Sequence, residues 1–327
     1  MLYVTTRDNK QTYTLEQALK NSVAPDGGRF VPQQLPEYDS SEIIALTNHS
    51  FSETVAHILN TLFVRRLSGW DVELVLGKAA PRMVTMNHRI AVAEMWHNPE
   101  GRIGYITDGL FSILSEDDMQ HAKCSDWFEI SVNIAVLFGL YGEMLRTDVL
   151  TPGQSFDISV PAEDFVVPMA GYYARKMGLP IGTIVCTCDE TSPVWDIIQR
   201  GTFSTSMASS GLLMGIERLI SAELGSDAVD DYLVRQHKKL TYSVPEECET
   251  FADGFFCAVT GEPRAASIIN SVYRNNTYFV DPHTALCLGG LQDYRAKHGS
   301  VHVALVPAVC NPAHYAKEIE TATGQSF

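Results

Sequence analysis

The sequence predicts an α/β fold, with a small N-terminal helical domain followed by a mainly parallel sheet that has helices on both faces. From residue 127 onward, short apolar strands alternate with amphipathic helices, which is the order of repeated strand-helix-strand units. The chain has 327 residues, of which 45% are hydrophobic and 19% are charged. This composition supplies enough apolar side chains to cover both faces of a sheet, so we expect a folded globular protein.

Two helix-capping signals predict the N-terminal domain, which we expect to span residues 1–80. Residues 14–17 have the spacing of a capping box before an apolar helix that ends near Asn21, and two glycines in residues 24–28 then permit a tight turn. A second capping box at residues 50–53 opens a helix that carries its apolar side chains on one face.

Residues 81–327 are expected to form the α/β domain. A strand at residues 89–96 runs into a loop at residues 97–101, because alternating apolar residues are followed there by turn-forming residues. The later elements are expected as helix 127–145, strand 156–160, helix 165–177, strand 181–187, helices 193–200, 210–224, 227–240 and 262–273, strand 278–280, helix 282–297, strand 301–306 and helix 312–323.

The charge balance argues against two classes of partner. The 24 basic and 39 acidic residues give a net charge of −15, which repels nucleic acids and anionic membrane surfaces. The first ten residues lack a signal-peptide pattern and no run of 18 apolar residues occurs, so we expect a cytoplasmic protein. The ten histidines have no metal-binding spacing and the seven cysteines fit reduced thiols, so we expect no metal site.

Five stretches follow the order and spacing of one enzyme family. The most specific is the N-terminal block, which combines Tyr3-Val-Thr-Thr-Arg7, Leu15-Glu-Gln-Ala18 and Ala24-Pro-Asp-Gly-Gly-Arg-Phe-Val-Pro32. The others are Glu94-Met-Trp-His-Asn-Pro99, Ala170-Gly-Tyr-Tyr-Ala-Arg-Lys-Met-Gly-Leu-Pro180, Ser204-Thr-Ser-Met207 with Ile216-Glu-Arg-Leu219, and Asp281-Pro-His-Thr-Ala285. Together they resemble threonine synthase, a fold-type-II pyridoxal-phosphate enzyme of amino-acid biosynthesis.

The same resemblance identifies residues that this chain lacks. In the family, the motif that corresponds to Glu94-Met-Trp-His-Asn-Pro99 leads to a lysine that binds the cofactor, and counting from Glu94 places Gly104 at that position. The family then inserts a smaller domain of roughly 100 residues, about the size of an independent folding unit. Here about twenty residues, 107–126, replace it. The resemblance therefore implies a shortened α/β domain without the Schiff-base lysine.

The phosphate-binding loop also departs from the family pattern. Glu163, Asp164 and Phe165 stand where the family has Gly-Asn-Phe-Gly, and Val132 stands where the family has an arginine that holds the substrate phosphate. Two carboxylates would repel a phosphate by roughly 1 kcal/mol per charge pair at about 4 Å in water, and by more near a protein surface. We expect Glu163 and Asp164 to complement the dipole of the following helix instead.

Our preferred hypothesis is a non-catalytic pseudoenzyme that binds a small ligand or a protein partner, with no cofactor. The candidate ligand-lining residues are Glu94, His97, Asn98, Arg102, His283 and Thr284. Glu94 and His97 could instead hydrogen-bond the loop backbone, and His283 could belong to a helix start with Asp281 as its N-cap and Pro282 in its first turn.

Two alternatives stay open. The first is a divergent pyridoxal-phosphate-dependent threonine synthase, or a related lyase, that uses another lysine such as Lys123. The second is a regulatory or structural subunit that pairs with an intact paralogue through the surface left bare by the missing domain. We also expect the chain to form an oligomer, either with itself or with such a paralogue.

Overall fold

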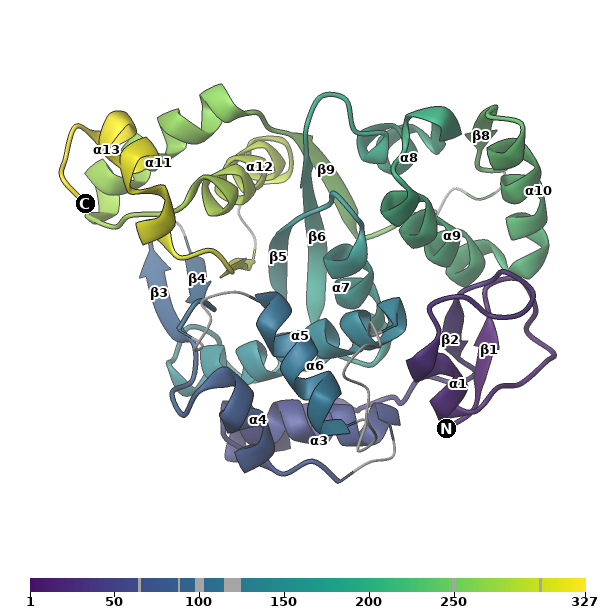
Figure 1. Ribbon diagram of the computed structural model, residues 1–327. Coiled ribbons are helices and arrows are strands. Elements are labelled where there is room, and N and C mark those ends of the chain that lie inside the picture. The colour runs from purple at the N-terminus through teal and green to yellow at the C-terminus, as the bar shows by residue number, and fades with distance from the viewer. Residues whose placement is uncertain are drawn as a thin grey trace.

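The computed structural model of the chain describes residues 1–63, 66–87, 89–97, 103–114, 125–246, 248, 251–299 and 302–327. A six-stranded sheet lies at its centre, and the predicted α/β fold with a mainly parallel sheet is confirmed (Figure 1). Only β3 runs antiparallel to its neighbour within this sheet. In spatial order the strands are β3 (Arg82–Met86), β4 (Ile90–Glu94), β10 (Val303–Ala308), β5 (Phe156–Pro161), β6 (Ile181–Cys188) and β9 (Phe255–Val259).

Helices follow most strands of the sheet, and the helices predicted between residues 127 and 297 are present to within a few residues. In chain order the described α-helices are α1 (Leu15–Lys20), α2 (Ser40–Ala45), α3 (Phe51–Phe63), α4 (Gly69–Leu76), α5 (Ile103–Leu114), α6 (Asp126–Arg146), α7 (Val166–Lys176), α8 (Val194–Arg200), α9 (Ser210–Leu224), α10 (Ser226–His237), α11 (Glu262–Asn276), α12 (Pro282–His298) and α13 (Ala316–Thr323).

The two faces of the sheet are covered by different helices. Successive residues of a strand point to opposite faces. On β5, Ser159 donates a 2.8 Å hydrogen bond to the carbonyl of Cys287, which lies on α12. Its neighbour Ile158 meets α7, where a Cβ atom added at Gly171 would lie 2.7 Å from Ile158 Cδ1. Helix α12, backed by α11 and α13, therefore covers one face, and α7 covers the other (Figure 1).

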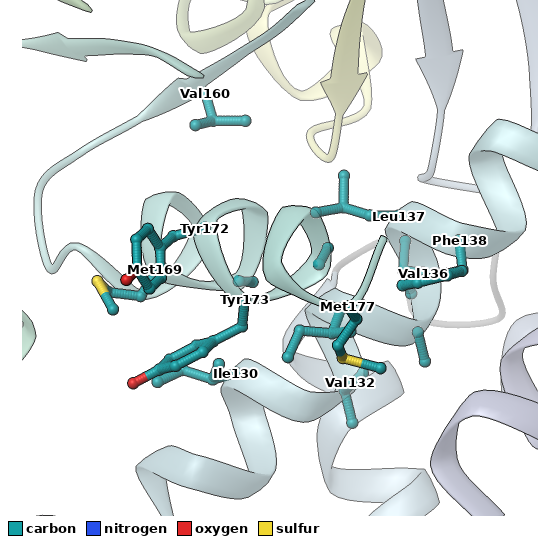
Figure 2. Packing of buried hydrophobic residues seen from close by; sticks show 14 of the residues in the cluster. Ile130, Val132, Val136, Leu137, Phe138, Val160, Met169, Tyr172, Tyr173 and Met177 are labelled. Atoms are coloured by element: carbon teal, nitrogen blue, oxygen red, sulfur yellow. The ribbon is translucent and has the colours of Figure 1, made fainter. Parts of the chain in front are cut away.

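Helix α6 lies behind α7 and also packs against α3. By length and composition it could cross a membrane, but 89% of its most apolar window is buried inside the protein, as is typical of a core helix. Figure 2 shows Ile130, Val132 and Leu137 of α6 around α7. Tyr173 of α7 and Met177, which directly follows α7, belong to the same core. Because α6 is held by α7 and α3, its orientation relative to the carboxyl ends of the strands is fixed.

The N-terminal region is not purely helical, which corrects the prediction. Strands β1 (Tyr3–Thr5) and β2 (Phe30–Pro32) pair in antiparallel orientation beside α1. The two predicted capping boxes are confirmed: Gln17 N–H donates to Thr14 Oγ1 and Glu53 N–H donates to Ser50 Oγ. One continuous apolar core joins this region to the central sheet.

Several other predicted elements were wrong or missed. Residues 278–280 form no strand, because Tyr278 has no neighbouring strand and directs its side chain to β4 instead. Helix α5 begins before the expected twenty-residue bridge and occupies its first part, and residues 115–124 lie outside the described part of the chain. The predicted helix at 312–323 begins as a 3₁₀ turn, η3 (Pro312–Tyr315), because Pro312 follows the N-cap Asn311. The sequence patterns also did not indicate β9, nor the small pair β7 (Thr202–Ser204) and β8 (Thr241–Ser243).

Candidate functional site

A cavity of about 200 Å³ lies at the carboxyl ends of three adjacent parallel strands. Met95 follows β4, Val160 and Pro161 end β5, and Pro307 lies near the end of β10. Open α/β sheets bind their ligands at this edge, because the loops that follow the strands converge there. The other apolar lining residues are Val136 and Leu137 of α6, Val166 and Val167 of α7, and Val309.

Five polar side chains interrupt these apolar walls. Thr107 comes from α5, Glu129 and Asn133 come from α6, and Glu163 and Asp164 come from the loop between β5 and α7. Glu129 and Asn133 are four residues apart, so they lie one above the other on one face of the helix. The polar groups therefore reach the cavity from three separate segments of the chain.

Glu129 is half-buried at this cavity, and within the described residues its carboxylate has no hydrogen bond and no ion pair. Burial raises the pKa of Glu129, and the negative charges of Asp164, Asp126 and Asp108 raise the pKa further. A carboxylate without a partner is costly to ionise when it is partly removed from water. The side chain is therefore held in an environment that opposes its own charge.

Two neutral groups accompany Glu129. Thr107 is only 5% exposed, and no described residue hydrogen-bonds its hydroxyl. Asn133 is 9% exposed and donates its amide N–H to the backbone carbonyl of Glu129 at 2.9 Å. The carbonyl oxygen of Asn133 accepts no hydrogen bond from the described residues. These groups line the cavity without a partner among the described residues, so they remain available to hydrogen-bond a ligand there.

Asp164 and Pro168 reduce the number of free N–H donors at the start of α7. Asp164 Oδ1 accepts the Val166 N–H at 3.1 Å, which confirms the prediction that Asp164 serves the helix N-terminus. Pro168 has no N–H, so one further donor of the first turn is missing. Phe165 adopts a left-handed backbone conformation with φ of 62°. Helix α9 packs closely on this loop, since a Cβ atom added at Gly215 would lie 2.5 Å from Phe165 Cβ.

These residues do not fit a phosphorylated cofactor. Within the part of the chain that the structure describes, no lysine or arginine lines the cavity, and its charged groups are carboxylates. The volume of about 200 Å³ is also below the roughly 300 Å³ at which pockets for larger organic ligands begin. Gly104 lies in the first turn of α5 and has no side chain with which to bind an aldehyde.

Glu94 and His97, two of the predicted ligand-lining residues, interact with each other instead of with the loop backbone, which corrects that interpretation. Glu94 is 3% exposed, and its carboxylate accepts the Tyr278 hydroxyl at 2.8 Å and meets His97 Nε2 at 2.6 Å. Burial, with the Glu94 charge, raises the pKa of Tyr278. These residues lie outside the 200 Å³ cavity, and the hollow beside Glu94 holds only about 10 Å³.

Two more candidates, Asn98 and Arg102, lie outside the described residues, as does Lys123. His283 and Thr284 lie in the first turn of α12, where Asp281 Oδ1 accepts both of their backbone N–H groups.

The helix start predicted at Asp281 and Pro282 is therefore confirmed. The His283 ring lies 3.1 Å from the Tyr315 hydroxyl, and the Thr284 hydroxyl donates to Asp281 at 2.5 Å. Neither side chain lines the 200 Å³ cavity.

Thr107, Glu129 and Asn133 were not predicted as site residues. A signal for two of them exists, because Glu129 and Asn133 are polar residues four apart in the apolar sequence 127–145. No comparable signal marks Thr107, because its neighbours across the cavity are distant in the sequence. Glu163 and Asp164, which were predicted only as a degenerate phosphate loop, do line the cavity.

Comparison with known proteins agrees with this architecture along the whole chain. The family model described as "Threonine synthase N terminus" matches residues 2–79. The threonine synthase of Pseudomonas aeruginosa is 27% identical over 435 aligned residues, covering 98% of this chain and 90% of that protein. A human protein named threonine synthase-like 1 is 24% identical over 199 residues, covering 56% of this chain. The chain spans only about a quarter, 26%, of that relative's length.

Solved structures show the same fold. Yeast threonine synthase has a TM-score of 0.79 at 15% identity, covering 98% of this chain and 89% of the yeast chain. Threonine synthase from Brucella melitensis, described as PLP bound, has a TM-score of 0.78 at 18% identity, covering 100% of this chain and 92% of that one. Residues 2–79 match the N-terminal region of threonine synthases, and the whole chain is similar to threonine synthases in sequence and shares their fold.

Proposed function

We propose that this protein is a threonine synthase-like pseudoenzyme that carries out no pyridoxal-phosphate chemistry and binds a small ligand at the carboxyl edge of its sheet. One observation carries the proposal. Within the described lining residues, the charged groups of the cavity are Glu129, Glu163 and Asp164, all of which are carboxylates. A phosphorylated cofactor or substrate would bring two more negative charges to the same place.

The energetics favour exclusion of phosphate. A pair of like charges about 4 Å apart costs roughly 1 kcal/mol in bulk water and about four times as much near a protein surface. The N-terminus of α7 offers little compensation, because Asp164 already accepts the Val166 N–H and Pro168 has none to donate. Gly104 removes the amine that would form the covalent bond to the cofactor.

Loss of the smaller cofactor domain is part of the same proposal. The alignment with the Pseudomonas aeruginosa enzyme runs over 435 residues, whereas this chain has 327, so more than a hundred aligned positions have no residue of this chain. Unaligned positions in that number would accommodate one whole folding unit. The cavity, in contrast, supports binding of a small molecule, because unpaired polar groups and apolar walls enclose it.

Equilibrium dialysis with pyridoxal 5′-phosphate tests the proposal. The wild-type protein should show no saturable binding at pyridoxal 5′-phosphate concentrations up to about 1 mM. A dissociation constant of about 1 mM corresponds to a binding free energy of roughly −4 kcal/mol. The double variant Glu163→Gln/Asp164→Asn should retain more of the compound because it loses two repulsive charges. The matched control, Asp227→Asn/Asp230→Asn, removes two charges from exposed positions of α10 and should behave as wild type. Saturable binding of one equivalent by the wild-type protein would refute the proposal.

A further inference from the structure

The polar groups of the cavity offer more hydrogen-bond acceptors than donors. Glu129 presents a carboxylate, Asn133 presents a free carbonyl oxygen and Thr107 presents a hydroxyl that can accept as well as donate. Thr107 is nine-tenths buried and lines the cavity without a described partner. A complementary ligand must therefore supply several N–H donors and a positive charge at one end.

The rest of the cavity selects an apolar body. Most of its lining consists of valine, leucine, methionine and proline side chains, which would make favourable contacts with a hydrocarbon chain. An engineered apolar cavity of about 150 Å³ holds a benzene molecule. On that scale a cavity of about 200 Å³ accommodates roughly six to eight non-hydrogen atoms.

A metal ion matches this lining less well than an organic cation. The described residues contain no group of three histidine, cysteine, aspartate or glutamate side chains placed to hold a metal. Hard cations require six or more oxygen ligands or retained waters, which the valine-rich wall would displace. A primary ammonium needs only three acceptors, and its alkyl chain replaces the remaining water.

Resting on the proposed function, we propose that the cavity binds a small primary alkylammonium ion, with its ammonium group between Glu129, Thr107 and Asn133 and its chain against the valine wall. Occupancy gives the Glu129 carboxylate the partner that the protein itself does not provide. The raised pKa of Glu129 agrees with this assignment, because it reflects a charge that the ligand-free cavity does not stabilise.

Titration calorimetry with three probes of equal chain length tests the inference: n-pentylammonium, n-pentanol and pentanoate, at pH 7 and low salt. We expect n-pentylammonium to bind at least about tenfold more tightly than n-pentanol, because a hydrogen bond to a charged group contributes more than a neutral one. Pentanoate should not bind. The Glu129→Gln variant should lose about tenfold in n-pentylammonium affinity while n-pentanol affinity stays the same.

The control variant Asp230→Asn removes one exposed charge far from the cavity lining and should leave all three affinities unchanged. Equal affinities for n-pentylammonium and n-pentanol, or an unchanged ammonium affinity in Glu129→Gln, would overturn the inference. An equal loss in Asp230→Asn would also overturn it, because the attraction would then come from net charge. Dialysis with pyridoxal 5′-phosphate on the same samples separates the two claims, since only binding of that compound contradicts the proposed function as well.

Discussion

The side-chain amide of Asn133 donates a 2.9 Å hydrogen bond to the backbone carbonyl of Glu129, one turn earlier in α6. This bond uses one of the two amide N–H donors of Asn133, and Asn133 and Glu129 both line the cavity. Two unpaired acceptors on one face of a core helix conflict with good packing, and such conflicts are typical of functional sites.

Replacing Glu129 with glutamine should stabilise the ligand-free protein at neutral pH. The folded-state pKa of Glu129 is raised above 4.5 by burial and by Asp164, Asp126 and Asp108. Its contribution to stability is therefore fully present below the unfolded pKa and is lost as pH rises through the folded pKa. In urea unfolding, Glu129→Gln should have a higher free energy of unfolding than wild type at pH 7. This difference should shrink as the pH approaches 4. A loss of stability at pH 7 would show that the carboxylate has a stabilising partner.

The Tyr278→Phe substitution should destabilise the protein by about 1.5–3 kcal/mol, because it removes a donor to the buried Glu94 carboxylate. Tyr294→Phe is the matched control: it breaks a neutral hydroxyl pair with Thr183 and should cost only about 0.5–1.5 kcal/mol. Chemical denaturation of both variants gives the comparison. Equal losses would mean that the charge of Glu94 adds nothing to the bond.

Arg218 should be essential for attachment of the N-terminal strand pair. It is fully buried, donates to the Phe30 carbonyl at 2.6 Å and pairs with Asp126 at 2.9 Å. Arg218→Ala leaves the Phe30 carbonyl and the Asp126 carboxylate without their arginine partner. We therefore expect the free energy of unfolding to fall by about 3–5 kcal/mol. Arg200→Ala, which removes the exposed pair with Asp196, should cost at most about 1 kcal/mol. A small loss for Arg218→Ala in thermal unfolding would contradict this role.

Gly215→Ala should disturb the loop before α7. Its new Cβ atom would lie 2.5 Å from Phe165 Cβ and 3.1 Å from the Asp164 carbonyl, so we expect a loss of about 1–3 kcal/mol. Gly211→Ala on the same helix makes only an ordinary 3.4 Å contact with Asp164 and should stabilise the protein by up to about 1 kcal/mol. Denaturation midpoints of the two variants should therefore move in opposite directions.

Local sequence signals predicted the elements that depend on local interactions. Thr14, Ser50 and Asp281 cap helices as their neighbours indicate, because each cap bonds to a residue two or three positions away. The prediction of a strand at residues 278–280 was wrong because strand formation needs a partner that lies elsewhere in the chain.

The cavity could be predicted only in fragments, for the same reason. Glu163 and Asp164 were recognised as departures from a family pattern, but their proximity to Glu129 depends on α6 packing behind α7. Thr107 lines the same cavity from α5, and Pro307 lines it from β10, 200 residues later in the chain. No local sequence pattern can indicate a contact between residues so far apart.

We propose that this protein keeps the threonine synthase scaffold without the cofactor chemistry. The most direct measurement is peptide mass spectrometry after incubation with pyridoxal 5′-phosphate and reduction with borohydride, which makes any lysine-cofactor bond permanent. We predict no lysine modified above the level of a denatured control. Stoichiometric modification of one lysine, such as Lys123, would contradict the account and favour a divergent pyridoxal-phosphate enzyme.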